Sequence, residues 1–382
     1  MKNILIVTPS FDTGGTTTAL INLLPLLPKD QYTVDVFPIT NTGNARERVA
    51  KYATLLVPYR SNGNSNSNNA KIKTYNYLIA IVKALKRILF KIGIDISPYF
   101  FKRTANQLQR KKYDIVIAFQ EGHPTSIVKH ISCPFKVAWV HSIYSRFSAA
   151  MDKKKLLQDY ECYDKIVCVS NVAAEDMRNE VPSIAERICT IYNGLSTEWI
   201  QERSIEFVVT KDKFTLISIG RVDPVKRFSE IPQMARDLLN KGLSFNWIII
   251  GGGADSKEAA LLEKRIKDYQ VADCVNWIGK QSNPYPFLKS SDLLVCLSYS
   301  ETFNYTLAEA RALNVPVITT DFPAAKEFVI NNKTGIIVPI EGVGNAIYEM
   351  MCNKEYYNLI KEGAKQLPDW NKRVVYQLNQ IL

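Results

Sequence analysis

The sequence predicts an α/β protein made of two parallel-sheet domains that face a cleft. Short apolar runs alternate with helix-forming segments along the chain, the pattern of parallel sheets with crossover helices. The chain has 382 residues, too many for one ordinary core and suited to two domains. A polar, charged stretch at 195–213 interrupts the alternation, and a second series of apolar runs follows it. We therefore place a linker in that stretch.

The composition is that of a globular protein from a reducing compartment. Hydrophobic residues make up 46% of the chain and charged residues 22%. Seven cysteines are scattered, mostly inside apolar runs, with no C-x-x-C pair and no histidine at ligand spacing. We expect them to be buried thiols. The first apolar run, Ile4–Val7, is too short for a signal peptide, and no stretch approaches the length of a membrane span. These features predict a cytoplasmic location.

The first domain is expected over residues 1–200. Its first strand, Ile4–Val7, leads through a polar turn with Gly14 and Gly15 into a helix over 19–27. Paired glycines let a ligand approach the backbone and leave the following amides directed at it, although a plain strand-to-helix turn has the same pattern. The same patterns predict further strands at 32–39, 55–59, 114–119, 137–140, 163–170 and 188–194, and a helix at 45–53.

Most of the net charge of +11 is concentrated between Ala70 and Lys112, where eleven basic residues accompany one acid, Asp95. Within this segment, apolar residues recur at helical spacing over 78–92 and basic residues fall on the opposite face, which predicts a basic amphipathic helix. Such a helix is typical of a segment that lies on an anionic membrane, and equally of one that packs its apolar stripe on its own domain. No nucleic-acid-binding motif accompanies it, so we expect no nucleic-acid partner.

Two strand ends of the first domain carry side chains suited to a ligand. Glu121 and His123 follow the strand at 114–119, and His141 follows the strand at 137–140. Parallel sheets bind ligands just past the carboxyl ends of their strands. An imidazole there can donate to a sugar hydroxyl or to a developing charge. A capped turn with a surface histidine explains Glu121 and His123 almost as well, and position alone favours a structural histidine at 141.

The second domain is expected over 201–365. Its first strand, Phe214–Ile219, is followed by Gly220, Arg221 and, five residues further on, Lys226. Two fixed cations at a strand end can neutralise a leaving diphosphate, whereas the alternative is a basic turn before a helix. Further strands are expected at 247–250, 275–279, 293–297, 315–319 and 335–339, and a last helix at 369–382.

The stretch from Ser300 to Ala310 joins the strand at 293–297 to a helix expected from Leu307. The first amides of a helix stabilise a phosphate without any side chain. Glu301 precedes this helix and Glu309 lies inside it, and a carboxylate accepts hydrogen bonds from the hydroxyls of a ribose or sugar. The stretch predicts a nucleotide site, although two glutamates on a solvated helix face give the same spacing.

Glu301 and Glu309, with seven residues between them after a strand, resemble the signature of the retaining family-four glycosyltransferases. These enzymes share the GT-B fold, which has two Rossmann-like domains. The segments 139–142 and 220–228 resemble the same family in the same order, and the resemblance covers nearly the whole chain. This chain departs from the family at Thr302 and Asn304, where glycine is usual. Bulkier side chains therefore stand beside the expected phosphate contacts, although asparagine tolerates unusual backbone angles.

The resemblance implies a metal-independent retaining glycosyltransferase without a cofactor. It would move a sugar from a nucleoside-diphosphate sugar, with a UDP-sugar favoured, to a glycan or lipid-linked acceptor. Glu301 would contact the donor sugar and His141 would stabilise the reaction centre. The implied donor-binding residues are Gly15, Arg221, Lys226, Phe303, Asn304, Tyr305, Thr306 and Glu309, and the implied acceptor-side residues are Gly14, Glu121 and His123.

The resemblance also implies that residues 366–382 return to the first domain. Together with the basic segment, it favours a lipid-linked acceptor at the inner face of the membrane, as in bacterial surface-polysaccharide assembly. Two alternatives remain at this stage. One is a sugar-nucleotide epimerase of the same fold, which needs no acceptor, and the other is a non-catalytic carbohydrate-binding or membrane-binding scaffold.

Overall fold

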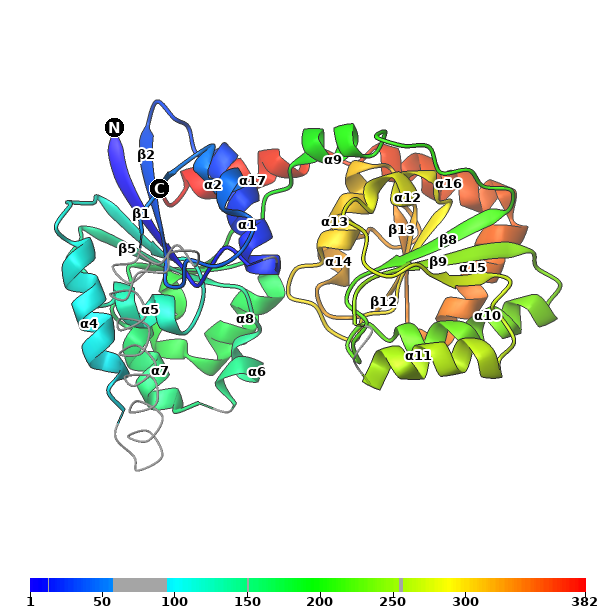
Figure 1. The fold of residues 1–382 in the computed structure, drawn as a ribbon, viewed down its shortest axis with the longest axis horizontal. Helices are drawn as coiled ribbons and strands as arrows, with labels where there is room; N and C mark the ends of the chain where they lie inside the picture. Colours follow the sequence, from blue (N-terminus) through cyan, green and yellow to red (C-terminus); the bar gives the residue numbers. More distant parts are fainter. Residues whose placement is uncertain (13, 58–94, 150, 254–256) are drawn as a thin grey trace, which may run out of the picture. The chain divides into compact units, whose positions relative to one another are not determined.

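The computed structural model describes residues 1–12, 14–57, 95–149, 151–253 and 257–382, so the basic helix expected at 78–92 lies outside the described residues. The described chain forms two compact units (Figure 1). Unit 1 contains Met1–Val169, Ala173–Gly194 and Val374–Leu382, and unit 2 contains Ser170–Val172 and Leu195–Arg373.

Apart from the short excursion at Ser170–Val172, the chain changes unit at Leu195 and at Val374, whereas the sequence predicts changes at 201 and 366. The later return has a physical cause. Trp370 stacks on Phe328 in unit 2, with ring centroids 5.4 Å apart and 13° between the planes. This contact keeps the start of the last helix, α17 (Trp370–Asn379), in unit 2, and only its second half belongs to unit 1.

Unit 1 contains a seven-stranded sheet in which all neighbouring strands are parallel. The residues Ile4–Val7 of one inner strand are fully buried, as expected for a parallel strand with helices on both faces. In spatial order the strands are β3 (Thr54–Leu55), β2 (Tyr32–Pro38), β1 (Lys2–Thr8), β4 (Ile115–Ala118), β5 (Phe135–Val140), β6 (Lys165–Cys168) and β7 (Ile188–Thr190).

The helices of unit 1 divide between the two faces of its sheet (Figure 1). One face carries α1 (Gly15–Leu23), the short η1 (Leu24–Leu26), α2 (Arg46–Ala50) and the end of α17. The other carries α4 (Ser97–Leu108), α5 (His123–Val128), α6 (Tyr144–Ser148), α7 (Lys153–Tyr160), α8 (Asn171–Glu180) and η2 (Pro182–Arg187).

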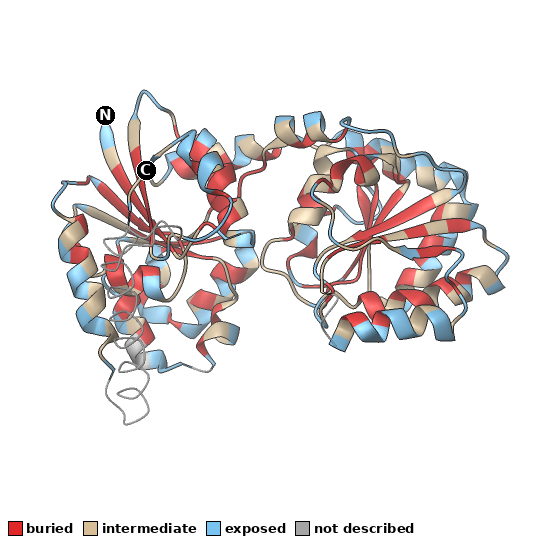
Figure 2. Ribbon diagram, viewed as in Figure 1, coloured by how far each residue is buried: buried red, intermediate tan, exposed pale blue. Residues whose placement is uncertain are grey.

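Unit 2 repeats this plan with a six-stranded parallel sheet. Figure 2 shows that its strands are mostly buried while the surrounding helices expose their outer faces. Trp247 is fully buried there, and its indole Nε1 donates to Ser218 Oγ at 3.1 Å. In spatial order the strands are β10 (Val275–Trp277), β9 (Phe245–Ile250), β8 (Phe214–Ile219), β11 (Leu293–Cys296), β12 (Val317–Thr320) and β13 (Gly335–Val338).

The helices of unit 2 also lie on both sides of the sheet (Figure 1). One side carries η3 (Phe228–Glu230), α10 (Ile231–Asn240), α11 (Lys257–Asp268), η4 (Ile340–Gly342) and α15 (Val343–Cys352). Helix α16 (Lys354–Lys365) packs on α15 and on β13. The other carries α9 (Thr197–Arg203), α12 (Tyr285–Ser290), α13 (Tyr305–Ala312) and α14 (Ala325–Phe328). The two predicted parallel-sheet domains are thus confirmed.

Each sheet contains one point at which the strand order reverses. In unit 1 the chain first builds outward from β1 and then continues from the other side with β4, and in unit 2 the same reversal separates β8 from β11. A crevice opens at such a reversal, outside the carboxyl ends of the two strands, and ligands of open α/β sheets bind there. The loops that follow β1, β4, β8 and β11 are therefore where a site is expected in each unit.

Candidate active site

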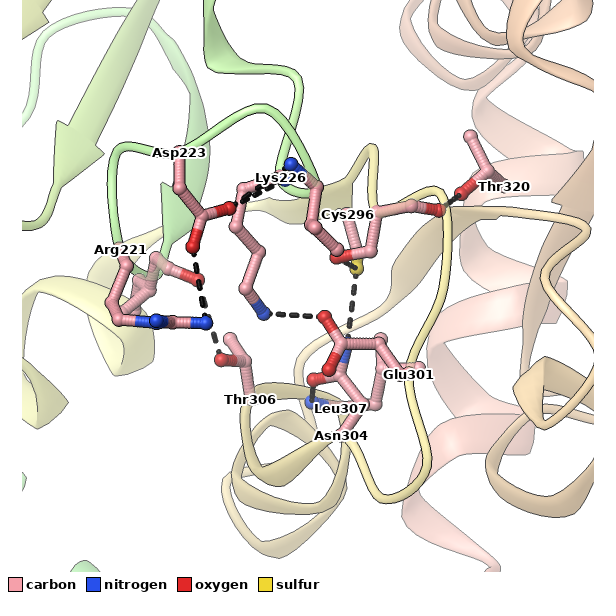
Figure 3. Close-up of polar contacts among 12 residues, drawn as sticks. Arg221, Asp223, Lys226, Cys296, Glu301, Asn304, Thr306, Leu307 and Thr320 are labelled. Atoms are coloured by element: carbon pink, nitrogen blue, oxygen red, sulfur yellow. Dashed lines mark hydrogen bonds and ion pairs between the residues drawn. The ribbon is translucent and has the colours of Figure 1, made fainter. Parts of the chain in front are cut away.

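The loop after β8 is shaped by Asp223. Its Oδ1 accepts the backbone N–H groups of Val225 and Lys226, each at 3.1 Å. Its Oδ2 lies 3.1 Å from Nη2 of Arg221 (Figure 3). The Arg221 side chain is 82% exposed, so its guanidinium group extends into solvent beside a carboxylate that orients it. One aspartate therefore fixes both the turn and the cation at its start.

Lys226 connects this loop to the loop after β11. Its Nζ lies 2.6 Å from Oε1 of Glu301, and both side chains are only 15% exposed (Figure 3). The backbone adds a second link, because the N–H of Tyr299 donates to the carbonyl of Val225 at 2.7 Å. An ion pair shielded from water is screened less than a surface pair. The two strand ends at the reversal of unit 2 therefore present a paired cation and anion.

Close backbone approach explains the glycines at this end of the sheet. A Cβ at Gly251, after β9, would lie 1.7 Å from the carbonyl oxygen of Gly220, after β8. A Cβ at Gly220 would lie 3.1 Å from Cε of Lys226. The first contact is impossible for any side chain, and the second would require the end of the lysine side chain to shift by a few tenths of an ångström. Both glycines thus maintain the position of the charged loop.

Helix α13 begins at Tyr305, two residues earlier than predicted, because Asn304 caps it. The Asn304 side chain is 2% exposed and accepts the N–H of Leu307 at 3.1 Å. Its Nδ2 also donates to Sγ of Cys296 at 3.3 Å (Figure 3). An asparagine in this position satisfies a helix-end amide that a glycine would leave to solvent or ligand. This is the consequence of the departure from the family pattern.

The other residues expected to hold the diphosphate lie around this cap. Thr306 Oγ1 donates to the carbonyl of Ile219 at the end of β8, at 3.3 Å. The ring of Phe303 packs edge to face against Tyr305 and Phe328, with both centroids at 4.9 Å. The first turn of α13 is therefore held from both sides, by β8 and by an aromatic cluster.

Glu309 lies on α13 and is half-buried. Its Oε1 accepts a hydrogen bond from the phenol of Tyr285 on α12 at 3.1 Å. Burial raises the pKa of Glu309 to about 7, although the Tyr285 hydrogen bond and the charge of Lys226 both lower it. The protonation state of this carboxyl therefore changes near neutral pH.

In unit 1, Glu121 joins the end of β4 to the end of β5. Its Oε2 accepts the backbone N–H of His141 at 3.0 Å, and its Oε1 accepts the hydroxyl of Ser142. Burial lowers the pKa of His141 to about 4, although the Glu121 charge and a hydrogen bond with the Phe119 backbone raise it. The imidazole is therefore neutral at pH 7. Its Nε2 is buried and has no hydrogen-bond partner within the described ranges.

The glycine turn of unit 1 borders a small open pocket of about 170 Å³. Gly14 is the N-cap of α1 and Gly15 its first residue, and a Cβ at either position would meet no atom within 4 Å. Neither backbone has a positive φ, so the fold itself does not require glycine here. The pocket is lined by Thr8, Pro9, Ser10, Asp12, Gly14, Gly15, Thr16, Thr17 and Gln120.

The remaining predicted residue, His123, is the first residue of α5. Its ring packs on Phe101 of α4, with centroids 5.3 Å apart, and it is exposed. Sequence reasoning gave no role to two residues that shape the site of unit 2. Asp223 has a local signal, an Asp-Pro turn just after Arg221. Tyr285 has none, because it is 24 residues from its partner Glu309.

Two family profiles together match almost the whole chain. Residues 13–199 match the family described as Glycosyltransferase Family 4, and residues 200–367 match the one described as Glycosyl transferases group 1. The chain belongs to these glycosyltransferases. In this glycosyltransferase, no helix within the described ranges is both long and apolar enough to span a bilayer. Nor does the described part group three or more His, Cys, Asp or Glu side chains as metal ligands would be grouped.

Relatives and solved structures agree with this assignment. The glycosyltransferase is 25% identical over 289 residues to the N-acetylgalactosamine-N,N'-diacetylbacillosaminyl-diphospho-undecaprenol 4-alpha-N-acetylgalactosaminyltransferase of Campylobacter jejuni, a match that covers 73% of this chain and 74% of the relative. Anabaena HepE, solved with UDP and glucose, has a TM-score of 0.71 at 15% identity, with 100% of this chain and 98% of HepE covered. A mutant of TarM from S. aureus, solved with fondaparinux, alpha-GlcNAc-glycerol and UDP, has a TM-score of 0.74 at 14% identity, with 100% of this chain and 99% of TarM covered. The fold is GT-B.

Proposed function

We propose that this glycosyltransferase moves a sugar from a UDP-sugar to a lipid-linked or glycan acceptor, with retention of anomeric configuration and without a metal ion. The observation that carries the proposal is the charged reversal point of unit 2. Lys226 and Glu301 meet there at 2.6 Å, Arg221 follows the end of the same strand as Lys226, and α13 begins beside them. A diphosphate needs cations and helix-end amides, and a sugar needs a carboxylate.

The two cations support metal independence. Negative charge accumulates on the diphosphate as the sugar leaves, and fixed positive groups aimed at that charge stabilise the transition state. Arg221 is already oriented by Asp223, and Lys226 would exchange part of its contact with Glu301 for the phosphates. Glu301 would then be released toward the sugar hydroxyls. In this scheme the acceptor attacks from the face that the diphosphate leaves, with the leaving group as base and no carboxylate nucleophile.

The remaining predicted roles fit the same proposal. Glu309 would accept the ribose hydroxyls, and the neutral His141, with its unpartnered Nε2, would accept from a sugar hydroxyl rather than supply a charge. Gly14 and Gly15 border a pocket into which a ligand can reach the amides at the start of α1.

The acceptor is inferred from chemistry and from relatives. The name of the Campylobacter jejuni relative specifies a diphospho-undecaprenol acceptor, and a capsular polysaccharide glycosyltransferase of Staphylococcus aureus is 30% identical over 127 residues, 33% of this chain. Helix α4 exposes Tyr99, Lys102 and Arg103 at its surface. A basic face of this kind suits an anionic membrane or a lipid diphosphate. We therefore place the enzyme on the inner face of the membrane, in surface-polysaccharide assembly.

Donor turnover tests this function. The purified protein is incubated with UDP-sugars and an undecaprenyl-diphosphate-linked sugar, with and without EDTA, and the product is identified by NMR, which also gives its anomeric configuration. We expect transfer that needs the acceptor, survives EDTA and yields an α-linked product from an α-linked donor. UDP-sugar consumption without an acceptor would favour an epimerase or hydrolase, and no consumption of any donor would favour a scaffold.

Two substitutions connect that activity to the proposed site. Arg221→Ala and Glu301→Ala should each lower donor turnover at least tenfold while the melting temperature changes little. Glu362→Ala is the matched control, because Glu362 forms an exposed ion pair with Lys365, 2.6 Å long, on α16. Unchanged donor turnover in both Arg221→Ala and Glu301→Ala would refute the proposal.

A further inference from the structure

We propose that Tyr285 is the positioning residue of the donor site: its phenol fixes the Glu309 carboxylate in the orientation that receives the ribose hydroxyls. This inference rests on the proposed function, in which Glu309 binds the ribose. Tyr285 is the first residue of α12 and Glu309 lies on α13. Their contact joins two helices on the same side of the sheet of unit 2 (Figure 1).

The geometry of the pair is that of a donor holding a carboxylate. The phenol oxygen of Tyr285 lies 3.1 Å from Oε1 of Glu309, and Tyr285 is 8% exposed. Within the described ranges this is the one hydrogen bond that the Glu309 side chain receives. A carboxylate with one oxygen held has its plane fixed, and its second oxygen has a defined direction. A ribose needs this, because its two adjacent hydroxyls must meet acceptors at set positions.

Tyr285 is itself held at its backbone and at its ring. Asn283, which is 5% exposed, accepts the N–H of Tyr285 at 3.2 Å and donates to the carbonyl of Arg203 at 2.8 Å. The ring of Trp199 on α9 packs edge to face on Tyr285, with centroids 5.6 Å apart. The guanidinium of Arg203 lies over the Trp199 ring, 5.2 Å from its centroid. The Tyr285 side chain therefore has little freedom to move with the Glu309 carboxylate.

A buried phenol often takes a carboxylate partner for packing reasons alone, whereas a role in ligand binding involves a feature that packing does not supply. That feature is the protonation state of Glu309. Two groups act on it besides burial: the phenol of Tyr285 from α12, and Lys226 from the loop after β8, whose ammonium group pairs with Glu301. Burial raises the pKa of Glu309 to about 7, and both groups lower it. Loss of the phenol should therefore raise this pKa further and leave less carboxylate at pH 7.

Affinity for UDP should then follow the ionisation of Glu309. The ionised carboxylate accepts both ribose hydroxyls, whereas the protonated form has given one acceptor position to its own proton. We expect the affinity of the wild-type protein to rise between pH 6 and pH 8. In Tyr285→Phe the rise should move to higher pH, so the variant binds more weakly at pH 7 and approaches the wild type at pH 9. Each unit of pKa shift corresponds to about a tenfold change on the sloping part of the curve.

Isothermal titration calorimetry with UDP from pH 6 to pH 9 tests this. The wild type is compared with Tyr285→Phe, Glu309→Gln and the matched control Tyr357→Phe. The Tyr357 phenol donates at 3.3 Å to the carbonyl of Asp292, elsewhere in unit 2. We expect a raised midpoint for Tyr285→Phe, weak and pH-independent binding for Glu309→Gln, and a wild-type curve for Tyr357→Phe. An unshifted midpoint in Tyr285→Phe, or the same shift in Tyr357→Phe, would overturn the inference.

Urea unfolding without ligand separates this inference from the proposed function. The folded-state pKa of Glu309 is raised, so protonation of its carboxyl group favours the folded state. This contribution to the free energy of unfolding is complete below pH 4.5 and is lost as pH rises through about 7. Relative to Glu309→Gln, the wild type should show this loss, and Tyr285→Phe should show it extended to higher pH. If Tyr285→Phe loses stability over the same pH range as the wild type, the effect of Tyr285 on Glu309 is refuted whether or not UDP binds. If the loss extends to higher pH in Tyr285→Phe but the wild type binds no nucleoside diphosphate, the proposed function is refuted, and with it the binding of ribose by Glu309.

Discussion

The two units share one strand plan, yet their reversal points differ in chemistry. In unit 2, the ends of β8 and β11 carry long charged side chains, and Lys226 and Glu301 pair at 2.6 Å. In unit 1, the ends of β1 and β4 border a pocket of about 170 Å³ lined by glycines and mostly short, uncharged side chains, with Asp12 as the one charged residue of its described lining. Topology therefore sets where a site can form, while the side chains at that place decide whether it presents an ion pair or an open pocket.

The charged residues of unit 1 sharpen this difference. Glu121, like Glu301, is a glutamate just after a strand, but its two oxygens accept from His141 and Ser142 and so hold the ends of neighbouring strands together. Glu301 is instead paired with the side chain of Lys226. The same residue type thus holds the backbone in one unit and pairs with a charged side chain in the other. The following predictions test this contrast.

The largest effect is expected for Lys226→Ala. Removing a cation aimed at the developing charge of the diphosphate should lower kcat for UDP-sugar turnover by about 10²–10³. Lys211→Ala is the matched control, because Lys211 also makes a 2.6 Å ion pair in unit 2, with Asp292, but is more exposed. Steady-state kinetics should show near wild-type turnover for the control. Comparable losses in both variants would mean that unit 2 tolerates no loss of a lysine, and the contrast between the units would fail.

The same substitution at two glycines should distinguish a glycine that close backbone packing requires from one that ligand binding requires. Gly251→Ala in unit 2 forces a Cβ against the Gly220 carbonyl, so the free energy of unfolding should fall by about 2–3 kcal/mol. Gly15→Ala in unit 1 meets no atom, so stability should be equal or higher by about 0.4–1 kcal/mol. Its donor turnover should nevertheless fall about tenfold.

Urea unfolding and steady-state turnover of both variants provide the measurement. A destabilised Gly15→Ala would show that the glycine turn of unit 1 is a folding requirement. A fully active and stable Gly15→Ala would show that no ligand approaches that turn closely.

The sequence predicted the strands well because their signal is local. The run Phe214–Ile219 was expected as a strand and is β8, with the same bounds. Helix starts were predicted less well: α13 begins at Tyr305 rather than Leu307, and α1 at Gly15 rather than Ala19. A helix start depends on which residue caps it, and at Asn304 this cap includes a contact with Cys296 from the preceding strand.

The site was predicted as separate residues but not as pairs. Lys226 and Glu301 were each expected at a strand end, yet their ion pair joins positions 75 residues apart. It exists because the strand order sets β8 beside β11, which no local pattern encodes. The proposed roles of these residues stay predictions until the kinetics are measured.

The protonation of His141 should be visible in stability. Its pKa is lowered to about 4 by burial. Between pH 6.5 and pH 4 the imidazole is therefore protonated in the unfolded chain but neutral in the folded protein. Stability should be unaffected by this group above pH 6.5 and should fall by about 1–2 kcal/mol by pH 5. Urea unfolding of the wild type and His141→Gln measures the difference, and NMR titration of the imidazole gives the pKa directly. A titration near 6.5 would contradict the buried, neutral imidazole of unit 1.

The smallest effect is expected at the helix cap of unit 2. Asn304→Ala should lower the free energy of unfolding by about 1 kcal/mol, and Asn304→Gly by a few tenths. Asn353 is the matched control, because it caps α16 in the same way, accepting the N–H of Tyr356 at 3.0 Å. Asn353→Ala and Asn353→Gly should each lower stability no more than the matching Asn304 variant in urea unfolding, because Asn353 is exposed whereas Asn304 is buried and also donates to Cys296.

The same four variants show whether the Asn304 side chain meets the nucleotide. Asn304→Gly releases the N–H of Leu307, and a backbone amide at a helix start can bind a phosphate directly. We therefore expect Asn304→Gly to keep its affinity for UDP, as Asn353→Gly does, in calorimetric titrations. If only Asn304→Gly loses affinity, the asparagine itself contacts the nucleotide. The departure from the glycine typical of the family would then have replaced an amide contact with a side-chain contact.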